Sequence, residues 1–146
     1  MNTRTSVLIA ILGLLAFILF LLLTGSPVLT AAIDPAGKFP AGTLLTWLGF
    51  ILLPLAIYLI IFSGPSAQDP RLNVFRMGLL IAFALSLLWG FAAYGLAGNW
   101  QYNFSGQAEQ FVGSSLAAEY FWYLNYLTLG WPLFVLVLYL GYRALK

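Results

Sequence analysis

Residues 7–23 read VLIAILGLLAFILFLLL, an uninterrupted apolar stretch without a charged or amide side chain. A hydrocarbon core about 30 Å thick requires roughly 20 helical residues to cross it. Three further stretches of similar length follow, so the predicted spans cover residues 5–24, 41–62, 74–97 and 117–142. The sequence therefore predicts an integral membrane protein with four spans.

The composition of the whole chain supports this class. Hydrophobic residues make up 62% of the 146 residues and charged residues 7%, whereas a soluble domain has about 25% charged residues. Only helices and closed barrels satisfy their backbone hydrogen bonds in lipid, and these runs lack the polar alternation of barrel strands. With short connections, we expect an all-α, four-transmembrane-helix antiparallel bundle that forms a single membrane domain over residues 1–146.

The first span also resembles the apolar core of a signal peptide, because Arg4 precedes it and small residues follow it. Its apolar run is longer than the roughly 7 to 15 residues of a signal core. We therefore expect this span to be retained as a membrane anchor.

Basic residues predict the orientation, since cytoplasmic segments retain Lys and Arg preferentially. Of the six basic residues, Lys38 alone falls in a predicted outer loop, and the others flank the opposite ends of the spans: Arg4, Arg71, Arg76, Arg143 and Lys146. We expect both termini to be cytoplasmic, with outer loops at 25–40 and 98–116 and an inner loop at 63–73. The predicted location is the bacterial inner membrane, as a multi-pass protein.

Small residues recur every four positions in the third span, at Gly78, Ala82, Ser86 and Gly90. This spacing places them along one slowly drifting stripe of a helix. Small residues allow helix backbones to approach closely in lipid, so the stripe is predicted to pack against another helix. A groove for a lipid tail, quinone or carotenoid is the alternative.

The loop at 98–116 carries Trp100, Tyr102 and Phe104 at alternate positions. Amphipathic aromatic rings settle at the headgroup level of a membrane, so the segment is predicted to lie along the outer surface. A docking edge for a partner protein is the alternative interpretation.

The fourth span begins with a dense group of aromatic residues around Glu119. Helical spacing places Glu119, Tyr123 and Tyr126 on one face, with Trp122 beside them, and this surplus of rings predicts a surface for a partner, lipid or cofactor. Asn125 lies deeper and needs a hydrogen-bond partner. Glu119 is a candidate proton or ion site, although a carboxylate at a helix start is also favoured by the helix dipole.

The chain contains neither His nor Cys, which removes the usual ligands of haem, copper and iron–sulfur centres. No combination of nucleophile, base or paired acids indicates catalysis, and no residue set indicates a metal site. We therefore expect no cofactor of its own, although bound lipid, quinone, carotenoid or a chlorophyll-type pigment stays open. The scattered basic residues form no patch of the kind that binds nucleic acid.

These observations predict a non-catalytic accessory subunit of a larger membrane complex, whose partners are other membrane-protein subunits and the lipid bilayer. A bacterial respiratory or photosynthetic electron-transfer assembly is the preferred setting. One alternative is a small homo-oligomeric transporter or channel that uses Glu119 and Asn125. Another is an assembly factor that binds a membrane complex transiently.

Overall fold

A computed structural model of the protein describes residues 3–62, 70–101 and 111–145. These residues form four long α-helices, α1 (Thr3–Thr24), α2 (Ala41–Phe62), α3 (Asn73–Ala97) and α5 (Ser115–Ala144). Two short 3-10 helices, η1 (Pro27–Thr30) and η3 (Pro70–Leu72), accompany them, and the described part of the chain contains no β-strand. Each long helix is long and apolar enough to cross a membrane. The third of these candidate spans includes η3 and covers Pro70–Ala97.

The ends of the helices follow local capping chemistry. The Ser114 side chain accepts a hydrogen bond from the Ala117 backbone N–H at 3.2 Å, so α5 begins before the predicted residue 117. At the other end of the preceding helix, Gly98 adopts a φ of 74° and donates its N–H to the Tyr94 carbonyl. Glycine suits this left-handed position because it has no Cβ.

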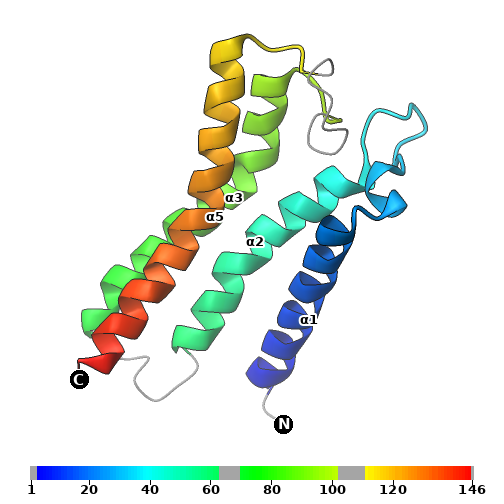
Figure 1. The fold of residues 1–146 in the computed structure, drawn as a ribbon. Helices are drawn as coiled ribbons and strands as arrows, with labels where there is room; N and C mark the ends of the chain where they lie inside the picture. Colours follow the sequence, from blue (N-terminus) through cyan, green and yellow to red (C-terminus); the bar gives the residue numbers. More distant parts are fainter. Residues whose placement is uncertain (1–2, 63–69, 102–110, 146) are drawn as a thin grey trace.

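Consecutive helices run antiparallel, as the contacts between them show. Near the two termini of the chain, Arg4 of α1 donates a hydrogen bond to the Phe62 carbonyl at the end of α2. Both termini lie at the same end of the molecule in Figure 1, which we call the terminal end. The opposite end carries the connection between α1 and α2, and we call it the loop end.

The helix α2 contacts all three other long helices, and α3 packs against both α2 and α5. By contrast, α1 packs mainly against α2 and lies on its far side from α3 and α5 (Figure 1). Three residues of α1 are buried, Ile11, Ile18 and Leu21. The protein is thus a bundle with one peripheral helix.

Two groups of buried side chains hold the three other helices together. One lies toward the terminal end and consists of Ile57, Ile61, Phe62, Leu72, Leu79, Val135 and Tyr139. The second lies toward the loop end and consists of Trp89, Ala93, Ala97 and Phe121, with Trp47 and Phe50 packed against it.

Candidate functional site

The small-residue stripe of α3 lies at the junction of three helices. Ala82 and Ser86 are almost completely buried. A Cβ added at Gly90 would approach the Trp47 ring of α2 to 2.5 Å. One added at Gly78 would approach Val135 of α5 to 3.1 Å.

The two ends of the stripe contact different helices for a geometric reason. A step of four residues turns about 40° beyond one full helical turn, so three steps rotate the stripe by roughly 120°. Gly78 therefore faces α5 while Gly90 faces α2. The stripe therefore contributes to the contact of α3 with α5 and to the contact of α3 with α2.

Indole groups from two helices donate hydrogen bonds to backbone carbonyls of this stripe. Trp47 Nε1 of α2 donates to the Ser86 carbonyl at 2.9 Å, and Trp131 Nε1 of α5 donates to the Gly78 carbonyl at 2.9 Å. The residue four positions after each carbonyl is small, Gly90 or Ala82, so the indole can approach the helix backbone. The stripe thus provides polar contacts as well as close packing.

Asn125 forms its hydrogen bonds inside the chain. Its Oδ1 accepts the N–H of Trp89 at 3.0 Å, and its Nδ2 donates to the Phe121 carbonyl at 2.8 Å. The Trp89 side chain is completely buried, so the Asn125 oxygen satisfies an indole N–H that water does not reach. Asn125 therefore links α3 to α5.

The other aromatic residues at the start of α5 point away from the bundle, except for Phe121, which is buried. The exposed ones form what we call the α5 aromatic face: Tyr120, Trp122, Tyr123 and Tyr126. Tyr126 is 65% exposed, and its ring stacks on that of Trp122 with the centroids 6.1 Å apart. This surface is continuous along two turns of the helix.

Glu119 is exposed on the same helix. Its Oε1 accepts a hydrogen bond from the Tyr123 hydroxyl at 2.9 Å, one turn further along. Glu119 is not among the residues that line three cavities formed by the described residues, one near Trp47, one near Pro54 and one near Leu15. Because α5 begins at Ser115, Glu119 lies in the second turn, beyond the first turn in which the helix dipole favours a carboxylate.

The connection from α1 to α2 folds into a small hairpin at the loop end. Ile33 N–H donates to the Phe39 carbonyl at 2.9 Å, and Asp34 Oδ1 accepts the backbone N–H groups of Lys38 at 2.8 Å and Phe39 at 2.6 Å. The bond from Phe39 is the main reason that the pKa of Asp34 lies below its ordinary value, with Lys38 contributing further. The Asp34 carboxylate is therefore ionised near neutral pH.

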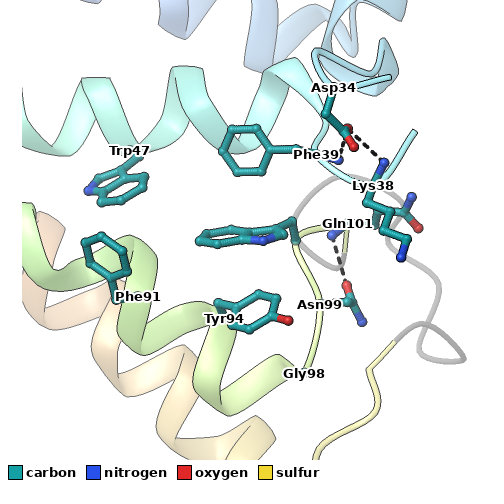
Figure 2. Close-up of a pocket in the computed structure, with 10 residues that line it drawn as sticks. Asp34, Lys38, Phe39, Trp47, Phe91, Tyr94, Gly98, Asn99 and Gln101 are labelled. Atoms are coloured by element: carbon teal, nitrogen blue, oxygen red, sulfur yellow. Dashed lines mark hydrogen bonds between the residues drawn. The ribbon is translucent and has the colours of Figure 1, made fainter. Parts of the chain in front are cut away.

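A cavity of about 660 Å³ opens between this hairpin, α2, the end of α3 and the residues that follow α3 (Figure 2). Its lining combines five aromatic rings, Phe39, Trp47, Phe91, Tyr94 and Trp100, with the polar residues Asp34, Lys38, Asn99 and Gln101 and with Gly98. We call it the aromatic pocket. Its size and its mixture of apolar walls and few polar groups match those of small-molecule sites.

Trp100 is the central ring of the aromatic pocket. It stacks on Tyr94 with the centroids 4.6 Å apart and meets Phe39 edge to face at 4.9 Å. The ring of Trp47 lies nearly parallel to it, at 6.4 Å and 19°. The Thr43 hydroxyl donates to the Trp100 carbonyl at 2.6 Å, which ties the segment after α3 to the start of α2.

Of the residues that line this pocket, Trp100 is the one that the sequence pattern indicates as a candidate contact residue. In the sequence, nothing distinguishes Trp47, Phe91 and Tyr94 from other aromatic residues of membrane spans. Phe39 lies in a predicted loop. Their common signal, aromatic rings at the same predicted membrane boundary, becomes informative only when the helices are paired. Tyr102 and Phe104, predicted next to Trp100, lie outside the described residues.

Comparison of the chain with models of protein families, with curated proteins and with solved structures finds no match.

Proposed function

We propose that this protein is a non-catalytic accessory subunit of a multi-subunit membrane complex and that the α5 aromatic face binds a neighbouring subunit. The observation that carries the proposal is the exposure of four aromatic side chains on one helix: Tyr120 55%, Trp122 49%, Tyr123 57% and Tyr126 65%. Tyrosine and tryptophan are enriched in the energetically important centres of protein interfaces.

The depth of this face supports a protein partner over a headgroup anchor. The 30 residues of α5 extend about 45 Å, which exceeds a hydrocarbon core of about 30 Å. Tyr126 lies about 5 Å from the midpoint of α5 along its axis. If α5 is centred in the bilayer, the backbone of Tyr126 lies well below the headgroups.

The neighbouring helices point to the same depth. Tyr126 follows Asn125, which contacts Trp89 of α3. The ring of Trp89 in turn meets that of Phe50 with the centroids 5.0 Å apart, and Phe50 lies close to the middle of the 22-residue α2. An aromatic belt is confined to the membrane boundary, whereas the α5 aromatic face extends toward the middle of the helices.

The setting of this subunit is an energy-transducing assembly of the bacterial inner membrane, respiratory or photosynthetic. The chain offers extensive helix and aromatic contact surface, and its described part contains no group of three or more carboxylate side chains that could hold a metal ion. Both features suit a subunit that contributes packing to a larger complex.

Site-specific photocrosslinking in native membranes tests the proposal. A photoreactive phenylalanine analogue replaces Tyr126 in one variant and Phe17 in the control, because Phe17 is 55% exposed near the middle of the peripheral helix α1. We expect the analogue at position 126 to crosslink to one defined protein, and the analogue at position 17 to react mainly with lipid.

Crosslinks to lipid alone at both positions would contradict the proposal. Purification in mild detergent provides an independent measurement, since a permanent subunit copurifies with its partner in fixed stoichiometry. Recovery of the protein alone would count against a subunit, and recovery of a substoichiometric amount with a complex would indicate an assembly factor.

A further inference from the structure

The aromatic pocket is amphipathic along its depth. Trp47 lies six residues after Ala41, the first residue of α2, which places its backbone about 9 Å inside the helix. The polar lining comes instead from the hairpin and from the residues after α3, beyond the helix ends. A ligand that fits the pocket therefore has an apolar part toward the helices and a polar part toward the loop end.

The charges at the polar end favour a neutral ligand. Lys38 and Asp34 are the ionic residues of the lining, and Asp34 is ionised because backbone N–H groups stabilise its carboxylate. The two charges offset one another, so neither a free anion nor a free cation is attracted by net charge. The Lys38 ammonium forms no ion pair within the described part of the chain and has only donors to offer. It calls for an oxygen acceptor on the ligand.

The walls are aromatic. Trp47, Tyr94 and Trp100 stack with one another, and a flat ring beside this group would extend it, because aromatic rings prefer offset-stacked or edge-to-face neighbours. The pocket is also open sideways, because Phe91 at its wall is 66% exposed on the outer surface of α3. An apolar tail on the ring would leave along Phe91 toward the surrounding lipid.

We propose that the aromatic pocket (Figure 2) binds the head group of a membrane quinone, with the ring against the aromatic side chains of the lining and a carbonyl oxygen toward the Lys38 ammonium. A quinone combines a neutral flat ring, carbonyl acceptors and an apolar tail. The site is built from α2, α3 and the loop end and does not include the α5 aromatic face. The test of this site is therefore independent of the test of the proposed partner.

Photoaffinity labelling of the full chain in phosphatidylcholine nanodiscs tests this site. The probe is an azido-substituted short-tail quinone, and decylubiquinone is the competitor. We expect saturable labelling of residues in the ranges 34–47 and 91–101, and we expect decylubiquinone to suppress it. The Trp100→Ala variant should weaken half-maximal labelling about tenfold through loss of ring contacts, and Lys38→Met about threefold through loss of one hydrogen bond.

Two further variants separate binding from folding. Trp100→Phe retains a ring and should bind nearly as tightly as the natural chain, which distinguishes a lost wall from a misfolded loop. Trp122→Ala removes an aromatic ring of the α5 aromatic face, outside the pocket, and should not change labelling. The exposed position of Lys38 makes Lys38→Met a substitution that leaves packing unchanged.

Labelling that does not saturate, or that Trp100→Ala and Lys38→Met leave unchanged, would overturn the proposal. Labelling suppressed by added phosphatidylethanolamine and not by decylubiquinone would also overturn it, because the site would then recognise a zwitterionic phospholipid. Loss of the predicted α5 crosslink with quinone labelling intact would refute only the proposed partner.

Discussion

The absence of a side chain at Gly90 allows α2 and α3 to pack closely. The Trp47 ring occupies the position next to the Gly90 backbone and donates its N–H to the Ser86 carbonyl one turn earlier. A methyl group at position 90 would meet three ring carbons at once. Close approach of α2 and α3 thus depends on this residue.

We predict that Gly90→Ala destabilises the folded state by about 1–3 kcal/mol, the usual cost of overpacking a tight contact. Gly95→Ala is the matched control on the same helix, because an added Cβ there has no neighbour within 4 Å. This control should be neutral or slightly stabilising, since Ala favours a helix over Gly. Reversible unfolding in mixed detergent micelles measures both, and equal stability of the two variants would contradict the prediction.

The hydrogen bond between Trp89 and Asn125 is a second contact that depends on individual side chains. Asn125→Leu leaves the buried Trp89 N–H without its acceptor and should cost about 1 kcal/mol. Trp89→Phe removes the donor as well as part of the ring. A double-mutant cycle isolates the hydrogen bond, and we expect a coupling free energy of about 0.5–1.5 kcal/mol. Additive effects of the two substitutions would show that the bond contributes nothing.

At the scale of the element, a carboxylate and several backbone hydrogen bonds hold the hairpin between α1 and α2. Asp34 accepts two backbone N–H groups, and Gly37 takes a φ of 68° where the chain reverses. The positive φ favours glycine at this position. The hairpin supplies Phe39 and Lys38 to the aromatic pocket, so its order affects the shape of that site.

The hairpin should respond to acid and not to changes near neutral pH. Because the pKa of Asp34 lies below its ordinary value of 3.8, folding favours the ionised carboxylate. Its stabilisation is complete well above pH 3.8 and is lost as the pH falls through the lowered pKa. The amide chemical shifts of Lys38 and Phe39 should follow a titration with its midpoint below 3.8.

Asp34→Asn is the control for this titration, because its amide oxygen can still accept the two bonds but carries no charge to titrate. We expect this variant to retain the hairpin and to lose the acid transition. A midpoint at or above 3.8 in the natural chain would contradict the stabilising role of the two backbone bonds.

At the scale of the whole molecule, the antiparallel order of four long helices places both termini at one end (Figure 1). Within the described ranges, the same end also carries the basic residues Arg4, Arg71, Arg76 and Arg143, while Lys38 lies at the loop end. Basic residues are retained preferentially on the cytoplasmic side. The basic residues at the two ends of the bundle therefore favour the same orientation, with the terminal end on the cytoplasmic side.

We predict that both termini face the cytoplasm. A reporter that is active only in the periplasm should be inactive when fused to the C-terminus and active when inserted at Ala36, at the tip of the hairpin. The opposite pattern would reverse the orientation and would place the aromatic pocket at the cytoplasmic side. Activity at both positions would contradict an even number of spans.

The sequence by itself determined the four helices and their approximate ends, because hydropathy summed over about 20 residues is a local property of the chain. It also identified the repeat of small residues in α3, since helical periodicity is local too. The tertiary structure alone decided which residues meet: Gly90 with Trp47, Trp89 with Asn125, and the rings of the aromatic pocket. An aromatic residue adds the same hydropathy whether it anchors, packs or lines a cavity. Its role depends on partners brought together from distant positions in the sequence.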